Sequence, residues 1–278
     1  MVKINLIYCM SDSINKICKL CCKENCISDY VKNVIICKKC NSIYANLDED
    51  TFPSITSINN KIKVKIQKKL AKILAESYVE YLKLNEGLSI TNMLDIGAGH
   101  GILVELLRKK GINSEGIESD ENTVKNSNSN TTHAFFDKNY STEQKYDLIT
   151  INQCLYYFSN QFEIIEKMSK MLKNNGRILI SNVNPESIFR LEHRIWTQGC
   201  RVVLGSPIFR NLEKFNLKCQ NITSYDDNLY KDYFLHKNGK IPDQKFWTNM
   251  ALYTLKIKKM ININENGINN FILLQKFS

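Results

Sequence analysis

The middle of the chain alternates short apolar runs with segments whose apolar residues recur at helical spacing. The helical spacing is found at 102–110 and 161–173. Apolar runs predict strands at 92–96, 111–118, 132–136, 146–153, 172–183, 217–225 and 269–277. Strands that alternate with helices pair in parallel and need cover on both faces. The pattern therefore predicts an α/β fold with helices on both sides of one sheet.

Three glycines stand at alternate positions directly after the strand at 92–96, where residues 94–101 read LDIGAGHG. Glycine has no Cβ and adopts positive φ, so such a turn lets the backbone come close to a ligand. Glu118 ends the next predicted strand. A carboxylate there can accept hydrogen bonds from two ribose hydroxyls. We interpret the turn and this carboxylate together as a nucleoside-cofactor site.

The spacing of the glycines helps to choose the nucleoside. Dinucleotide-binding turns read G-x-G-x-x-G around a pyrophosphate, whereas this turn reads G-x-G-x-G and has Ile102 where the third glycine would fall. The Gly-Lys-Ser/Thr of a phosphate-binding loop is absent. Asp95 precedes the turn, and a carboxylate suits S-adenosylmethionine (SAM), which has a sulfonium, an α-ammonium and no phosphate. SAM is therefore favoured, and a glycine turn in another kind of α/β protein is the alternative.

Four blocks of sequence, LDIGAGHG, GIESD, KYDLITINQCLYYF and LKNNGRILISNV, resemble the class I SAM-dependent methyltransferases in order and spacing. The resemblance covers about residues 90–185. It implies a Rossmann-like, seven-stranded methyltransferase sheet. The chain departs from the family at 174–176, where it has Asn-Asn-Gly in place of Pro-Gly-Gly. Asparagine tolerates left-handed turn conformations, so we expect the turn to be kept.

The resemblance also implies which residues bind the cofactor. They are Asp95, Gly97, Gly99, Gly101, Glu118, Asp137 and Asn152. Asp137 follows the third strand, where an acidic or amide residue often meets the adenine amino group in the family; a turn aspartate is the alternative reading. Asn152 stands at the end of the fourth strand, and open α/β sheets bind ligands at the carboxyl ends of their strands.

The catalytic residue is left unassigned. Methyl transfer is an in-line displacement that depends mainly on alignment and the exclusion of water, and a hydroxyl acceptor also benefits from a general base. The candidate bases are His193, His236, Tyr156 and Tyr157. Each tyrosine could instead pack beneath the following helix, and His193 could be a structural residue of a helical stretch.

Six of the ten cysteines lie between residues 18 and 40. Cys18, Cys21, Cys37 and Cys40 form two C-x2-C pairs separated by fifteen residues, a spacing within the range of zinc sites. Four thiolates make a closed, structural site. Cys22 and Cys26 compete as ligands at the first pair, and an iron–sulfur cluster is the alternative metal group. For the extra thiols, the alternative role is that of small buried side chains.

The sequence around the second pair, IICKKCNSIYAN, resembles the zinc ribbon that precedes the methyltransferase domain in many bacterial enzymes of sugar, surface-glycan and metabolite pathways. We therefore expect three parts: a zinc ribbon at 1–50, a helical linker at 51–89, and a SAM-binding methyltransferase domain at 90–278. Insertions around 186–260 are expected to select the acceptor. About 40 residues bury little core, so metal binding should supply the ribbon's folding energy.

Charge and composition leave three functions open. The net charge is +10, yet residues 91–185 carry 10 Lys and Arg against 11 Asp and Glu, so the positive excess lies in the flanks. This positive excess either serves to attract nucleic acid or anionic substrates, or results from compositional bias. We expect methyl transfer to a small molecule such as a sugar, glycan precursor or metabolite. An rRNA or tRNA methyltransferase and a non-catalytic binding subunit are the alternatives.

Nothing in the sequence suggests a membrane protein. The apolar runs are shorter than the roughly 20 residues that cross a bilayer, and the first residues do not form a secretory signal. We therefore expect a cytoplasmic protein. The sequence does not predict an oligomeric state.

Overall fold

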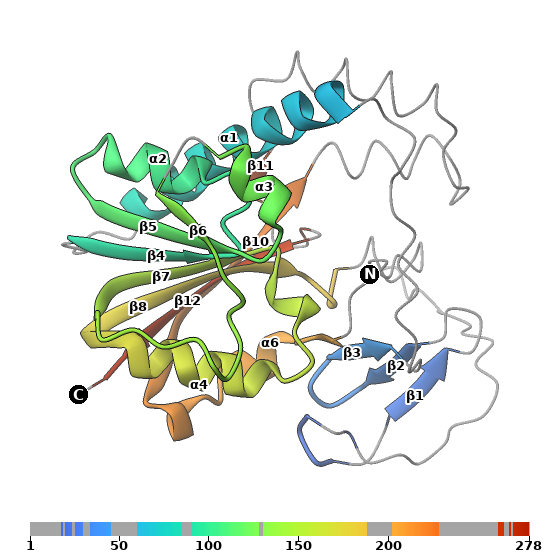
Figure 1. Ribbon diagram of the computed structural model, residues 1–278. Helices are drawn as coiled ribbons and strands as arrows, with labels where there is room; N and C mark the ends of the chain where they lie inside the picture. Colours follow the sequence, from blue (N-terminus) through green and yellow to red (C-terminus); the bar gives the residue numbers. More distant parts are fainter. Residues whose placement is uncertain are drawn as a thin grey trace.

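The computed structural model describes residues 18, 20–23, 26–29, 34–45, 60–84, 90–127, 130–187, 202–227, 261–263, 267 and 269–277. Within them, a large mixed sheet carries helices on both faces, and a small antiparallel sheet lies beside it (Figure 1). The predicted His193 and His236 lie outside the described residues, as does most of the expected acceptor-selecting segment.

The large sheet has the strand order β11-β10-β12-β8-β7-β4-β5-β6. Its strands are β4 (Asn92–Ile96), β5 (Asn113–Glu118), β6 (Thr131–His133), β7 (Tyr146–Asn152), β8 (Leu172–Val183), β10 (Leu217–Asp227), β11 (Ile261–Ile263) and β12 (Asn269–Lys276). Strands β4 to β8 pair in parallel, and β12 is antiparallel to both β8 and β10. The expected seven strands are confirmed, and the three-residue β11 extends the sheet by one edge strand.

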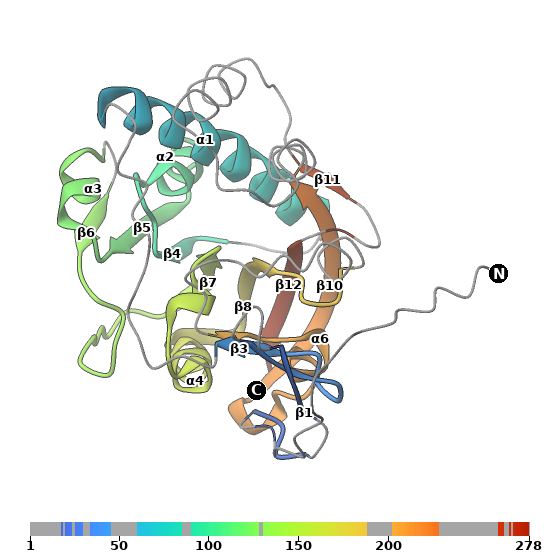
Figure 2. The ribbon, with the colours of Figure 1, turned by 90° about the vertical axis from the view of Figure 1, so that its right-hand side faces the viewer.

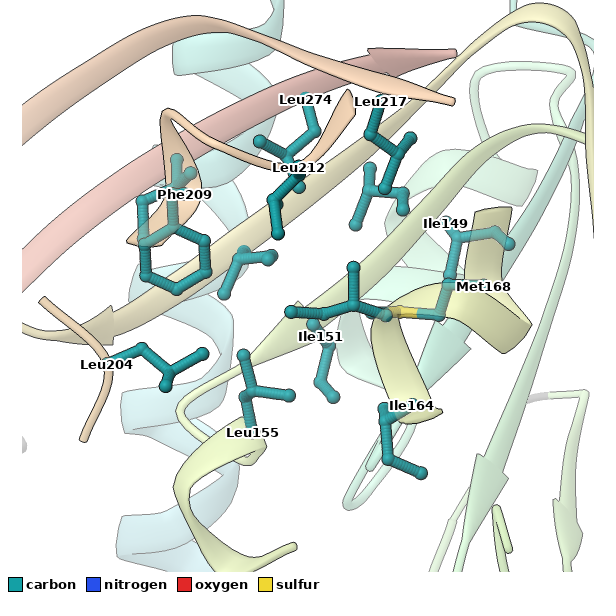
Figure 3. Close-up of a cluster of buried hydrophobic side chains, with 14 of the residues drawn as sticks. Ile149, Ile151, Leu155, Ile164, Met168, Leu204, Phe209, Leu212, Leu217 and Leu274 are labelled. Atoms are coloured by element: carbon teal, nitrogen blue, oxygen red, sulfur yellow. The ribbon is translucent and has the colours of Figure 1, made fainter. Parts of the chain in front are cut away.

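Alternate residues of the central strands enter two separate cores. Met93, Leu148 and Leu179 face α1 (Asn60–Leu84) and α2 (Ile102–Arg108). Leu94, Ile149 and the other inward residues of the opposite face pack against α4 (Gln161–Met171) and α6 (Ser206–Phe209). The second core is drawn in Figure 3, where Leu204, Phe209 and Leu212 meet Ile151 and Leu155. The strands therefore read as continuous apolar runs because both faces are covered.

Short elements connect these layers. They are α3 (Glu121–Lys125) and two 3-10 turns, η1 (Leu155–Tyr157) and η2 (Glu213–Phe215). Residues 174–176, where the family has Pro-Gly-Gly, lie within β8 and not in a separate turn. The expected left-handed conformation is found at Asn175, with a φ of 62°, where the register of β8 with β7 shifts between Tyr146 and Leu148. Both α6 and η2 lie between β9 (Val202–Val203) and β10.

The small sheet has the order β1-β2-β3-β9 and is antiparallel where paired. Three strands come from the cysteine-rich segment: β1 (Cys26–Asp29), β2 (Val34–Cys37) and β3 (Ile43–Ala45). The fourth, β9 (Val202–Val203), comes from the segment that follows β8. Two parts of the chain that lie far apart in the sequence therefore build this sheet (Figure 2).

Candidate functional site

The glycine turn between β4 and α2 holds its three glycines in the left-handed region. Gly97, Gly99 and Gly101 have φ values of 70°, 56° and 68°. A Cβ placed on Gly97 would lie 2.6 Å from Cys154 Sγ, whereas a Cβ on Gly99 would meet no atom of the described residues within 4 Å. The turn therefore packs tightly on one side and is open at Gly99, where a ligand can reach the backbone.

Glu118, at the end of β5, faces this open position. Its Oε2 accepts a hydrogen bond from the Gly99 backbone N–H at 2.9 Å, and its Oε1 accepts one from the Asp120 N–H at 3.0 Å. The carboxylate is thus fixed beside the turn. Each carboxylate oxygen has two lone pairs, so the group keeps acceptor capacity for ribose hydroxyls.

Asp95 lies buried beneath the turn, 3% exposed. Its Oδ1 accepts hydrogen bonds from Thr150 Oγ1 at 2.6 Å and from Asn152 Nδ2 at 3.2 Å. Burial raises the pKa of Asp95 to about 7, and the charge of Glu118 adds to this rise, while the two hydrogen bonds oppose it. A cation bound next to Asp95 would favour its ionised form.

Asn152 offers a specific test of whether the site suits SAM. Its Nδ2 donates to Asp95, but its Oδ1 is buried and has no hydrogen-bond partner among the residues that the structure describes. A buried acceptor without a donor is costly, and an ammonium group can supply that donor. The residues present, two carboxylates, an unpaired amide oxygen and an open glycine backbone, fit the ribose and the amino-acid end of SAM.

A network of hydroxyl and amide groups follows directly after Asn152. Gln153 has a left-handed φ of 51°, and its Nε2 donates to Ser181 Oγ at 2.9 Å and Tyr225 Oη at 3.1 Å. The Tyr78 hydroxyl, from α1, donates to Ser181 Oγ at 3.3 Å. Ser181 and Tyr225 oxygens lie 2.6 Å apart. The ends of β7, β8 and β10 are thereby joined to α1.

Sequence reasoning did not single out these network residues. Tyr78 lies in the segment expected to form the helical linker, and Gln153 is the last residue of the strand predicted at 146–153. Burial raises the pKa of Tyr78 well above its usual range, with added contributions from Tyr225 and the Asp95 charge. Gln153 could have been recognised as a site residue by its left-handed backbone conformation at the carboxyl end of a strand. That conformation is seen only in the structure.

The two candidate tyrosines have different environments. Tyr156 is buried, and its hydroxyl donates to Gln153 Oε1 at 3.3 Å. Tyr157 is 50% exposed, and its ring packs edge-to-face on that of Tyr156 with centroids 4.6 Å apart. Tyr156 therefore belongs to the polar network at the end of β7. Burial raises the pKa of the neighbouring Cys154 to about 12, with added effects of Glu118 and Asp95, so this thiol is protonated at neutral pH.

Asp137 is exposed after β6. Its Oδ1 accepts hydrogen bonds from the Asn139 and Tyr140 backbone amides at 2.8 and 3.2 Å. This arrangement supports the turn-aspartate reading. An adenine contact of Asp137 stays a prediction.

The four predicted metal ligands lie together. The Sγ atoms of Cys18, Cys21, Cys37 and Cys40 are all within 4.8 Å of one another. Sγ of Cys18 and Cys40 are 3.8 Å apart, and those of Cys21 and Cys37 are 3.7 Å apart. Zinc–sulfur bonds of about 2.3 Å place tetrahedral ligands about 3.8 Å apart. The four thiols therefore fit a zinc ion.

The two cysteine pairs repeat one backbone pattern. In each, the amide two residues after the first cysteine donates to its Sγ at 3.4 Å. The residue after the second cysteine, Cys22 or Asn41, has a φ of 54° or 56° and donates its N–H to the first cysteine's carbonyl. Cys22 is exposed and stands in the turn beside the four-sulfur cluster.

Comparison with known proteins gives the family. A family model described as a methyltransferase domain matches residues 60–226, more than half of the 278 residues. The chain belongs to this family. It is a SAM-dependent methyltransferase, as its sequence had indicated. The match starts at α1 and ends in β10, so it includes the glycine turn and the polar network.

Curated relatives of this methyltransferase include two named ubiquinone biosynthesis O-methyltransferase. The one from Histophilus somni is 24% identical over 189 residues, which cover 59% of this chain and 74% of the relative. The one from Photobacterium profundum is 29% identical over 194 residues, which cover 62% and 80%.

Solved structures share the fold. The plantazolicin methyltransferase BpumL in complex with SAH has a TM-score of 0.51 and 20% identity, covering 78% of this chain and 90% of its own. A SAM-dependent methyltransferase from Archaeoglobus fulgidus has a TM-score of 0.52 and 16% identity, covering 78% and 100%. Among the described residues of this methyltransferase, no helix combines the length and apolarity needed to span a membrane.

Proposed function

We propose that this methyltransferase transfers the methyl group of SAM to a small-molecule acceptor, such as a sugar, glycan precursor or metabolite. The observation that carries the cofactor part of this proposal is the hydrogen bond between the open Gly99 backbone N–H and the Glu118 carboxylate, at 2.9 Å. The curated relatives act in ubiquinone biosynthesis according to their names, which favours a small acceptor with a hydroxyl group.

In the proposed site, Glu118 accepts from the ribose, and Asp95 and Asn152 face the amino-acid end. When bound, SAM supplies an activated methyl group on a sulfonium. The protein's own task is to align the acceptor and exclude water. The loop after β7 carries that task, because Gln153 and Tyr156 stand where ligands bind in open α/β sheets. Tyr156 and the exposed Tyr157 stay candidates for acceptor contact.

We also infer that Cys18, Cys21, Cys37 and Cys40 hold one structural zinc ion. The support is the sulfur spacing, the two equivalent turns and the burial of three of the four thiols. A closed four-sulfur site leaves no open position for a substrate, so the metal's contribution is to the fold.

The acceptor class is tested by supplying labelled SAM to the purified chain together with either a small-molecule extract or total RNA. Small-molecule methyl transfer predicts label in the low-mass fraction and none in RNA. RNA methylation predicts label in RNA, together with salt-sensitive RNA binding, since phosphate contacts weaken steeply with salt. Label confined to RNA would overturn the proposal.

A further inference from the structure

The cysteine-rich module, residues 18–45 with the strands β1 to β3, forms a strand pair with the methyltransferase domain. Its strand β3 pairs antiparallel with β9, with Ile43 opposite Val203 and Tyr44 opposite Val202. Figure 2 shows β3 beside α6, which follows β9 directly. A segment more than 150 residues away in the sequence thus completes the module's sheet.

The approach at this junction is unusually close. A Cβ placed on Gly205 would lie 2.0 Å from the carbonyl oxygen of Cys40 and 2.8 Å from the carbonyl carbon of Asn41. The Gly205 N–H donates to Ser42 Oγ at 2.9 Å, and the same hydroxyl lies 3.3 Å from Cys40 Sγ. Gly205 is therefore required here because no side chain fits against the second cysteine pair.

The strands β3 and β9 also contact the loop that follows β7. Ile43 and Val203 form one buried cluster with Tyr156 and Val183. Gln161, the first residue of α4, donates from Nε2 to the carbonyl oxygens of Leu155 at 2.9 Å and Val202 at 2.6 Å. The side chain of Tyr156 is thus held from one side by the module and from the other by Gln153.

We infer that the cysteine-rich module positions the loop 153–157, so that metal binding to the module and the conformational order of this loop are coupled. The module is too small to keep its sheet without the metal. Loss of the metal therefore removes the support of β9 and the packing of Ile43 on Tyr156. The inference rests on the proposed function only where it assumes that this loop contacts the methyl acceptor. The coupling between metal binding and the loop is a property of the fold.

Hydrogen exchange on the full-length protein tests the coupling without any acceptor. The Tyr157 and Phe158 amides are hydrogen-bonded within η1, and Val203 lies in β9. Removal of zinc with a chelator should speed exchange of the 155–158 and 202–204 segments by about tenfold or more. Exchange of β4 should stay unchanged, and re-addition of zinc should reverse the effect. Unchanged exchange at 155–158 after complete metal loss would overturn the inference.

Gly205→Ala separates docking from metal binding, because it changes neither a cysteine nor a cofactor residue. When the variant and the wild type are both loaded with metal, as the thiolate charge-transfer absorption of their cobalt-substituted forms verifies, residues 155–158 should exchange about tenfold faster in the variant. Ser206→Ala, one residue further on, should behave as wild type. A zinc-loaded Gly205→Ala variant with wild-type exchange at 155–158 would contradict the inference.

If Gly205→Ala does not fold, Ile43 supplies the same test. Ile43→Ala leaves a cavity against Tyr156 and should speed exchange at 155–158, whereas Ile43→Val keeps most of the packing and should restore slow exchange. Equal exchange in both variants and the wild type would count against the coupling. SAM affinity, measured in parallel, reports on the proposed function separately, since wild-type protein that binds no SAM would refute that function and leave the exchange result intact.

Discussion

The Glu118 carboxylate accepts a hydrogen bond from the Gly99 backbone N–H at 2.9 Å. The end of one strand is thereby tied to the turn that follows its neighbour, and β4 and β5 pair in parallel up to this point. The same carboxylate thus supports the turn and faces the side of it that is open. Its removal should affect cofactor binding more than folding.

Glu118→Gln keeps the size of the side chain and an oxygen for the Gly99 amide but loses the charge and two acceptor positions. Hydrogen bonds to charged groups contribute about 1.5–3 kcal/mol each, so SAM affinity should fall by about ten- to a hundredfold. Titration calorimetry measures this loss. Glu121→Gln, an exposed acid on α3, is the matched control and should bind as wild type. Equal affinity in Glu118→Gln would exclude its ribose role.

The affinity for SAM should depend on pH through Asp95. The pKa of this carboxyl is about 7 in the free protein because of burial and, less strongly, the Glu118 charge. A cationic ligand group nearby favours the ionised form, so binding lowers that pKa and releases a proton. SAM affinity should therefore rise with pH through about 7 and level off above it. In Asp95→Asn, affinity should be weaker and lose this rise. A flat profile in the wild type would show that the ligand's charge lies elsewhere.

Asp147 should stabilise the sheet in a pH-dependent way. Burial raises its pKa, but hydrogen bonds from Thr91, Lys173 and Asn92 outweigh that effect and lower the pKa to about 2. A folded-state pKa below the unfolded value of about 3.9 gives stability that is present above pH 4 and lost as pH falls through 2. Asp147→Asn should cost about 1–2 kcal/mol of unfolding free energy at pH 7.

Denaturant unfolding at several pH values checks this cost. The difference between Asp147→Asn and wild type should shrink as the pH falls from about 4 to about 2, because the Asp147 carboxyl of the unfolded wild-type chain takes up a proton in this range before that of the folded protein does. Glu143→Gln changes an exposed acid in the preceding loop and should have little effect at any pH. A difference that stays constant down to pH 2 would mean that packing, not charge, explains Asp147.

Cys21 and Cys22 should differ in their effect on zinc. Elemental analysis should find about one zinc per wild-type chain, and Cys21→Ser should lose it, because a closed four-sulfur site needs all its ligands. Cys22 has a φ of 54°, a conformation that glycine takes without strain. Cys22→Gly should therefore keep its zinc and be as stable as wild type or more so. Zinc loss in Cys22→Gly and retention in Cys21→Ser would reverse the ligand assignment.

The sequence predicted the features that depend on local pattern. The strand at 92–96, the glycine turn and the helix at 102–108 follow from apolar runs and glycine spacing within a few residues. The four-cysteine cluster follows from the regular spacing of its pairs. These features are readable because each is encoded by neighbours in the chain.

The features that sequence reasoning missed depend on distant parts of the chain. Tyr78, on a helix, donates a hydrogen bond to Ser181, which lies 103 positions later in the chain. The helical spacing of apolar residues predicts that Tyr78 is buried, but it does not predict the partner of its hydroxyl. The pairing of β3 with the two-residue β9 has no periodic pattern to reveal it. Gly205 reads as an ordinary loop glycine until Cys40 is placed against it. Such contacts follow from topology, which a single sequence does not specify.

The central claim, that the glycine turn is the SAM site, is tested most directly by titrating SAM into wild-type protein, Gly99→Arg and Gly111→Arg. Both glycines have positive φ and open space around the Cβ position, with φ values of 56° and 83°, so both variants carry the same kind of backbone strain. Gly99→Arg places its side chain beside Glu118, whereas Gly111 lies in the turn after α2. Wild type and Gly111→Arg should bind SAM with micromolar affinity, and Gly99→Arg should not bind it. Unchanged SAM binding in Gly99→Arg would contradict the account.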